Sequence, residues 1–160
     1  MNIYQNRYVI RNTIIAALGG FLFGFDTAVI SGTQHALQQV FLLDEFWLGF
    51  TVSIALIGTV IGSIAVGKPA DIFGRKQTLI GIAVLYIVTA LGCASAKHWY
   101  VFLFFRFIGG LGVGAASVIS PMYIAEISSA ESRGRLVAIS QFNIVTGILV
   151  VFFRITLLPR

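Results

Sequence analysis

The chain has 160 residues, of which 58% are apolar and only 11% charged, and its formal net charge at pH 7 is +5. An ordinary soluble domain carries about 25% charged residues, so this composition argues against a soluble enzyme and indicates a membrane protein. The basic residues are spread between apolar blocks, so no nucleic acid partner is expected. The lone Cys93 predicts neither an intrachain disulfide nor a zinc site.

Five apolar stretches are long enough to cross a lipid bilayer, because a hydrocarbon core of about 30 Å takes about 20 helical residues. The predicted helices cover about 13–32, 47–66, 77–96, 100–124 and 136–156. The first stretch is longer than the apolar part of a signal peptide and lacks a small-residue cleavage site, so we expect it to be retained. Open sheet edges are not tolerated in lipid, so the predicted fold class is an all-α membrane protein with short loops.

Lysine and arginine residues are concentrated on one side of the predicted bundle. They lie before the first helix and in alternate loops, at Arg7, Arg11, Lys68, Arg75, Lys76, Arg133 and Arg135. The other side carries Lys97, together with Arg154 and Arg160 near the end of the sequence. Short cytoplasmic loops are enriched in basic residues, so we predict a multi-pass protein of the cell (inner) membrane with a cytoplasmic N-terminus.

Small residues recur at every fourth position of the first predicted helix, from Ala16 to Gly32, which allows another helix to approach closely. A short internal repeat links residues 19–31 (GGFLFGFDTAVIS) with residues 109–120 (GGLGVGAASVIS), in helices of opposite direction. Inverted repeats of three helices are typical of secondary transporters. Chance similarity in glycine-rich apolar sequence is the alternative explanation of this match.

Two charged side chains interrupt the apolar helices. A charge near the bilayer centre costs about 2.5–3.5 kcal/mol, and the helical rise places Asp26 and Arg106 at about the same depth. We therefore expect a direct or water-bridged pair between them. Pairing favours the charged carboxylate whereas burial disfavours it, and this competition suits a proton switch. A fixed structural ion pair between the first and fourth helices is the alternative.

A second group of charges lies in the predicted cytoplasmic loops. One loop contains Asp71 and Arg75 beside Gly74, which permits a tight turn. The next cytoplasmic connection contains Glu126 and Arg133. Acids and bases from the two loops can pair in one conformation and separate in another.

Two motifs resemble those of a known family. The loop GKPADIFGRK resembles the G-x-L-x-D-x-x-G-R-K/R signature of the major facilitator superfamily, with Pro69 in place of the usual Leu. The stretch RFIGGLGVGAASVISPMYIAEISSAESRGRL is similar to the sugar porter signature that follows the fourth helix. The first helix, GGFLFGFDTAVISG, is also very similar to that of bacterial proton-coupled sugar porters. The similarity extends to about Val151, and the final RITLLPR no longer resembles the family.

The resemblance implies about five helices of the N-terminal six-helix half of a monosaccharide transporter that works by alternating access. It implies that Asp26 is the protonation site and that Arg106 is its partner, so protons are the coupling ion and no cofactor or metal is expected. The charge network that latches the outward-facing state would comprise Asp71, Arg75, Glu126 and Arg133.

The resemblance also implies that Phe23 lines the sugar cavity and that Gln141 binds sugar hydroxyls. By its own chemistry Gln141 can bind hydroxyls or bond another helix. The expected substrate is a monosaccharide such as xylose or a hexose, and Ile148 stands where a second sugar-binding glutamine is expected. The sixth helix and the C-terminal half of the family are absent from these 160 residues, so we expect the chain to be inactive alone.

A different class of function stays open at this point. The chain could be a complete small multispan protein that acts as an oligomer, or a non-transporting partner of another membrane protein. The sugar porter signature and the asymmetric loop charges argue against the small oligomeric protein, and a tight stoichiometric complex with another membrane protein would favour the non-transporting partner. A membrane enzyme is the least favoured reading, because the sequence contains no nucleophile–base pair or metal cluster.

Overall fold

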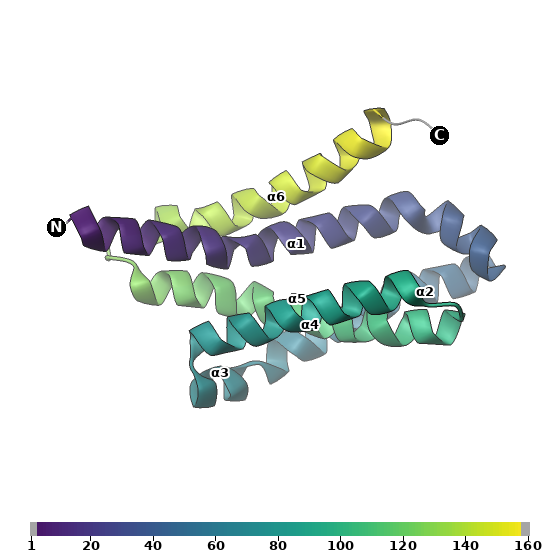
Figure 1. The fold of residues 1–160 in the computed structure, drawn as a ribbon, viewed down its shortest axis with the longest axis horizontal. Coiled ribbons are helices and arrows are strands. Elements are labelled where there is room, and N and C mark those ends of the chain that lie inside the picture. Colours follow the sequence, from purple (N-terminus) through teal and green to yellow (C-terminus); the bar gives the residue numbers. More distant parts are fainter. Residues whose placement is uncertain (1–2, 158–160) are drawn as a thin grey trace.

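The computed structural model describes residues 3–157, which form five long helices and one short helix (Figure 1). The helices are α1 (Ile3–Phe41), α2 (Glu45–Ala65), α3 (Gly67–Phe73), α4 (Arg75–Ser95), α5 (Trp99–Ile127) and α6 (Arg133–Leu157). All except α3 contain a segment that is long and apolar enough to cross a membrane. The predicted all-α fold with five candidate spans is confirmed. Arg160, one of the basic residues counted in the sequence, lies outside the described residues.

Every long helix begins before its predicted apolar stretch, and the largest difference is in α1, which runs from Ile3 to Phe41 where 13–32 was expected. Hydropathy marks only the apolar part of a helix, whereas its backbone hydrogen bonds continue until the chain turns. Here the turn comes at Leu42, whose φ of 52° lies in the left-handed region. The next helix begins after Asp44, whose Oδ1 accepts a hydrogen bond from the backbone N–H of Trp47 at 2.8 Å.

The segment expected to be a loop between the second and third spans contains the short helix α3. It ends at Gly74, whose φ of 82° is readily adopted only by glycine, so the tight turn expected there is present. Pro69 lies in the first turn of α3, where a missing N–H removes no helical hydrogen bond. This turn directs the chain from α3 into α4.

The long helices run side by side, with α6 on one side of α1 and α2, α4 and α5 on the other (Figure 1). The N-terminus, α3 and the connection from α5 to α6 lie at one end of the bundle. The connections from α1 to α2 and from α4 to α5 lie at the opposite end. The most extensive contacts join α2 with α5 and α1 with α6, while α1 and α5 connect these two pairs.

Glycines allow the backbones of α2 and α5 to touch. A methyl group at Gly114 of α5 would overlap the carbonyl oxygen of Thr59 on α2. A methyl group at Gly62 of α2 would overlap the carbonyl oxygen of Leu111 on α5. Close approach through small residues is the usual basis of helix association in lipid, because the hydrophobic effect does not drive helices together there.

The contact between α1 and α6 is built in the same way. A methyl group at Gly24 of α1 would overlap the carbonyl oxygen of Ile144, and one at Gly147 of α6 would overlap that of Phe21. In the repeated stretches of the sequence, Gly24 and Gly114 occupy equivalent positions. The short internal repeat therefore corresponds to two similar helix contacts, made by helices of opposite direction (Figure 1).

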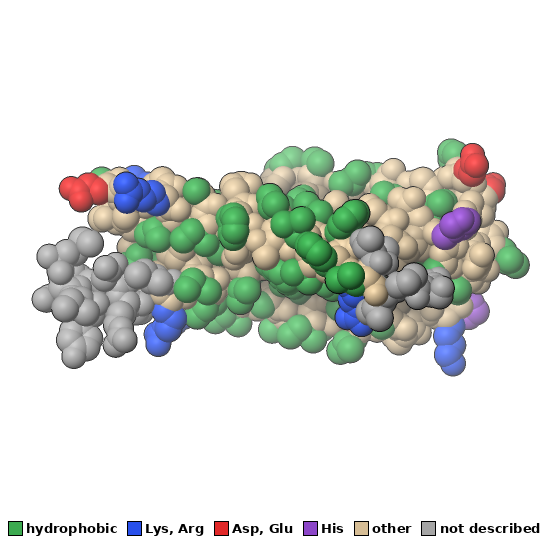
Figure 2. All heavy atoms as spheres, turned by 90° about the horizontal axis from the view of Figure 1, so that it is seen from above, with side chains coloured by type: hydrophobic (Ala, Val, Ile, Leu, Met, Phe, Trp, Pro, Cys, Tyr) green, Lys and Arg blue, Asp and Glu red, His purple; other side chains and the backbone are tan. Residues whose placement is uncertain are grey.

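Most of the molecular surface between the two ends is apolar. Large hydrophobic side chains are exposed on every long helix. Figure 2 shows such side chains spread along the length of one face, with acidic side chains only at its two ends. Aromatic residues gather where α2 and α5 begin, and the rings of Trp47 and Trp99 lie 5.2 Å apart. An apolar belt with tryptophan near its edge is the pattern of a membrane-embedded bundle.

We predict that Gly114→Ala lowers the stability of the purified chain, because the added methyl group would overlap the backbone of α2. Overpacking of this kind costs about 1–3 kcal/mol. The matched control is Gly81→Ala on α4, where a methyl group meets nothing within 4 Å. Thermal unfolding followed by circular dichroism in lipid nanodiscs measures both variants, and equal melting temperatures would contradict the close α2–α5 contact.

Candidate functional site

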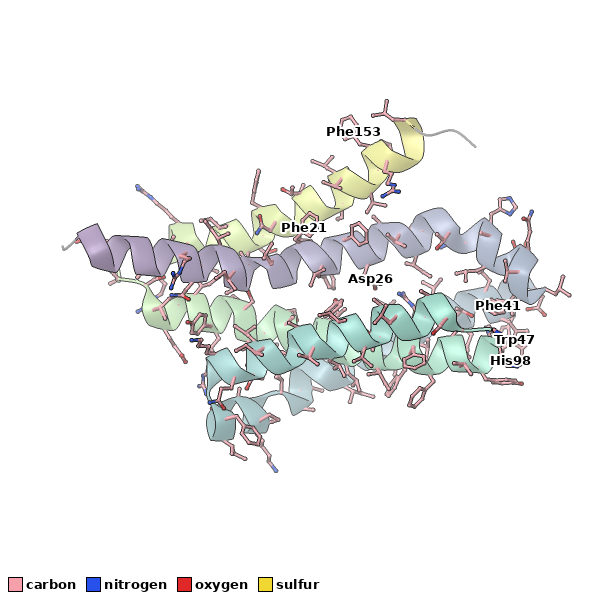
Figure 3. The ribbon with its side chains drawn as sticks, viewed as in Figure 1. Phe21, Asp26, Phe41, Trp47, His98 and Phe153 are labelled. Carbon is pink, nitrogen blue, oxygen red and sulfur yellow. The ribbon has the colours of Figure 1, made fainter. Side chains whose placement is uncertain are left out.

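The two charged residues inside the apolar helices form an ion pair. Arg106 of α5 donates from Nη1 to Oδ1 of Asp26 on α1 across 2.7 Å. The side chain of Arg106 is 11% exposed and that of Asp26 is 35% exposed. Asp26 lies midway along α1, on the side that faces α4 and α5 (Figure 3). The residues that the sequence analysis placed at the same depth are therefore in direct contact.

Small residues bring α1 and α5 close enough for this pair to form. A methyl group at Gly19 of α1 would lie 3.5 Å from Cβ of Ala116 on α5, an ordinary van der Waals contact. One turn away, the buried hydroxyl of Ser120 donates to the carbonyl oxygen of Ala16 at 2.5 Å. These contacts determine how α1 and α5 cross. The Asp26–Arg106 ion pair lies further along the same two helices.

A cavity of about 530 Å³ adjoins the ion pair, between α1, α4 and α5. Asp26 and Arg106 both line it, and most of the other lining residues are apolar. Its remaining polar or titratable side chains are Thr33 of α1 and Tyr86, Thr89 and Cys93 of α4. Nothing in the sequence marks α4 as part of this site, because Tyr86 and Cys93 lie in an apolar helix and carry no charge.

Two polar atoms that belong to the cavity residues are buried without a hydrogen-bond partner among the described residues. They are Nε of Arg106 and the hydroxyl oxygen of Tyr86. The two threonine hydroxyls differ from them, because Thr33 donates to the carbonyl of Val29 and Thr89 to that of Tyr86. The side chains around the cavity thus include two buried donors without a partner among the described residues, next to one carboxylate.

The arrangement suits reversible binding of a proton. Asp26 is the carboxylate of the cavity, and it can exist as a charged partner of Arg106 or as a neutral acid. The first state stabilises the ion pair, and the second leaves the charge of Arg106 without its partner. Within residues 3–157 no group of three or more His, Cys, Asp or Glu side chains gathers to hold a metal ion.

A second cluster of charges lies at the end of the bundle that contains α3. Arg75 of α4 contacts Oδ1 of Asp71 on α3 at 2.6 Å through Nη1, and Oε1 of Glu126 on α5 at 3.0 Å through Nε. Its Nη1 also donates to the carbonyl oxygen of Ala70 at 2.8 Å. Arg133 is exposed at the start of α6 and makes no ion pair with the described residues. The structure therefore brings together three of the four residues expected in this network.

The two residues expected to contact sugar lie apart from the Asp26 cavity. Phe23 is half-buried on α1, Gln141 is exposed on α6, and neither lines that cavity. Gln141 has no side-chain hydrogen bond to the part of the chain that the structure describes.

The chain matches known transporters over most of its length. A family model described as "Sugar (and other) transporter" matches residues 12–158. The "Glucose transport protein" of Synechocystis is 48% identical over 144 residues, which are 90% of this chain and 31% of that protein. The "D-xylose-proton symporter" of Escherichia coli K12 is 39% identical over 175 residues, covering 93% of this chain and 36% of the symporter. The chain spans about a third of the length of these curated relatives.

Solved structures of transporters have a fold similar to that of this chain. The proton:xylose symporter XylE of the major facilitator superfamily, bound to 6-bromo-6-deoxy-D-glucose, superposes with a TM-score of 0.87 at 41% identity. That match covers 93% of this chain and 37% of the symporter. An inward-open structure of the xylose transporter XylE from E. coli gives a TM-score of 0.83 at 42% identity, over 89% of this chain and 38% of XylE. The helices and their order are thus those of an experimentally observed bundle.

We predict a larger coupling energy for the Asp26–Arg106 pair than for an exposed pair. In a double-mutant cycle with Asp26→Asn and Arg106→Gln, the coupling free energy should be about 1–3 kcal/mol, because Arg106 is largely shielded from water. The matched cycle uses Arg75→Gln and Glu126→Gln, where the 49% exposure of Glu126 should make the coupling smaller. Unfolding in mixed micelles measures both, and a smaller value for the Asp26 cycle would contradict the shielded pair.

Proposed function

The chain belongs to the sugar porter family of the major facilitator superfamily, and we propose that it supplies the proton-coupling part of a monosaccharide–proton symporter. The family consists of membrane transporters rather than enzymes. The observation that carries the proposal is the Asp26–Arg106 pair, because a carboxylate inside an apolar bundle is a functional group by default. Proton binding at Asp26 is the chemistry that this pair supports.

The position of the pair explains how a proton would change the structure. The ion pair lies across the contact between α1 and α5, which connects the α1–α6 pair with the group formed by α2, α4 and α5. A proton that binds the Asp26 carboxylate removes its negative charge and weakens its attraction to Arg106. The two groups of helices are then less tightly held together, and a conformational change becomes easier. We assign this coupling role to the pair in preference to a purely structural one.

The proposed substrate is a monosaccharide such as xylose or a hexose. The relatives that support this choice are named for glucose and for xylose. In the proposal, Phe23 lines the sugar path and Gln141 hydrogen-bonds sugar hydroxyls, consistent with the exposed and unbonded side chain of Gln141. Alternating access needs two halves that move around a central site. We therefore propose that these 160 residues act together with a C-terminal half and do not transport sugar alone.

The proposed location is the cell (inner) membrane, with the N-terminus and α3 on the cytoplasmic side. The basic residues of the chain support this orientation, since Lys68, Arg75 and Lys76 lie around α3 and two arginines begin α6. The opposite end carries Asp44 and Glu45 between α1 and α2. This orientation makes the Arg75 cluster a cytoplasmic one.

The Arg75 cluster is proposed to latch one conformation of the transporter. One guanidinium holds acids from α3 and α5, so a change in the distance between these helices would break at least one ion pair. Exposed ion pairs contribute little to stability, so such a latch is easily released. Arg133 would join the network only in a conformation different from this one, because here it is exposed and unpaired among residues 3–157.

We predict that Asp26→Asn abolishes proton-driven accumulation of sugar but leaves sugar exchange. The assay uses a chimera in which residues 12–158 replace the matching segment of the E. coli D-xylose-proton symporter, reconstituted in liposomes. Asn fills the same space but cannot bind a proton at this position. The matched control is Asp44→Asn, since asparagine also caps helices and Asp44 is exposed. Uphill accumulation by the Asp26 variant would refute the coupling role.

We further predict that Arg75→Ala shifts the same chimera away from its latched conformation. The substitution removes both ion pairs and the bond to the Ala70 carbonyl. The neighbouring Lys76→Ala is the control, because Lys76 is exposed and makes no ion pair with the described residues. Crosslinking across the cytoplasmic side measures the shift, and equal crosslinking yields in the two variants would count against the latch.

A further inference from the structure

The hydroxyl of Tyr86 has no role in the site described so far. Tyr86 lies on α4, and its hydroxyl oxygen is buried without a hydrogen-bond partner among the described residues. A buried hydroxyl is unfavourable unless it finds a partner, so tyrosine at such a position usually reaches one. Phenylalanine would fill the same apolar space without this penalty. The hydroxyl therefore calls for an explanation beyond packing.

The surroundings of Tyr86 indicate what that partner is. Tyr86, Asp26 and Arg106 line one cavity, and Nε of Arg106 is a second buried donor without a protein partner. A carboxylate accepts about four hydrogen bonds, and Asp26 uses one oxygen for Nη1 of Arg106. A cavity of about 530 Å³ has room for water, which occupies about 30 Å³ per molecule in the liquid. A water molecule bound between these three groups would give both donors a partner and the carboxylate a further hydrogen bond.

We propose that Tyr86 is a positioning residue of the proton site, holding through a water molecule the Asp26 carboxylate in its charged form. The hydroxyl donates to the water, and the water donates to the free oxygen of the carboxylate. When Asp26 takes up a proton, the proton arrives on that oxygen, while Tyr86 keeps its own proton and Arg106 stays charged. This inference rests on the proposed proton-coupling role of Asp26.

The direction of the effect follows from the groups around the cavity. Its titratable and charged side chains are Asp26 from α1, Tyr86 and Cys93 from α4, and Arg106 from α5. The helix α2 contributes no residue to its lining, and Arg154 of α6 is exposed and does not line it either. Cys93 is a weak donor, so Tyr86 is the neutral group best suited to stabilise the carboxylate. Loss of its hydroxyl should therefore let Asp26 bind a proton at higher pH.

The test is a titration of Asp26 in the 160-residue chain reconstituted in lipid nanodiscs. Infrared difference spectra against the Asp26→Asn variant isolate the signal of the protonated Asp26 carboxyl group as pH is varied. Tyr86→Phe should move the midpoint of this signal to higher pH by about half a unit or more, the size expected for one lost water-mediated bond. The control is Tyr100→Phe, because Tyr100 is 76% exposed and lies at the start of α5, away from the cavity.

The outcomes separate this inference from the proposed function. A raised midpoint in Tyr86→Phe with an unchanged one in Tyr100→Phe, at equal helix content, supports the positioning role. A midpoint in Tyr86→Phe that stays unchanged or falls overturns that role and leaves the proton site intact. A carboxyl signal of Asp26 that is absent at every pH overturns the proton-coupling role and this inference together.

Discussion

Two opposite charges inside an apolar bundle can be accommodated only if they meet, and the rest of this structure depends on that constraint. Asp26 belongs to α1 and Arg106 to α5, so their contact at 2.7 Å requires these helices to cross at one register and one separation. Either charge alone would stay buried without compensation, which is more costly than the pair. The bundle is therefore arranged around this contact.

The glycine contacts join the helices into two pairs, and the Asp26–Arg106 ion pair lies between these pairs. Gly114 lets α5 touch α2, and the equivalent Gly24 lets α1 touch α6, so each pair of helices is joined backbone to backbone. Backbone contacts of this kind do not depend on protonation. The joint between the pairs contains the Ser120 hydrogen bond, the ion pair and the packing of Ala16 and Ala17 around Ile124. A change of charge at Asp26 would thus act at the contact between the two pairs of helices.

The two charged sites of the bundle have different environments and suit different tasks. The Asp26–Arg106 pair is largely shielded and adjoins a mostly apolar cavity, so a single proton changes its energy strongly. In the Arg75 cluster the two carboxylates are exposed, and water and salt weaken their ion pairs with the half-buried Arg75. Weak pairs that join α3, α4 and α5 can exchange partners with little cost. The first site is thus suited to sensing a proton and the second to following the movement of helices.

The sequence by itself determined the fold class, the five spans and the two charged residues that form the ion pair, because apolar length and a charge within an apolar stretch are local properties that need no partner to be recognised. It did not determine where α1 ends, because hydropathy detects the apolar part of a helix and not its polar continuation. Nor did it reveal that Tyr86 and Cys93 face the ion pair, that Arg133 stays out of the Arg75 cluster, or that Phe23 and Gln141 lie apart from the cavity. These features depend on the rotation of each helix and on which helices are neighbours. Only the tertiary packing, set here by glycine contacts between backbones, decides both.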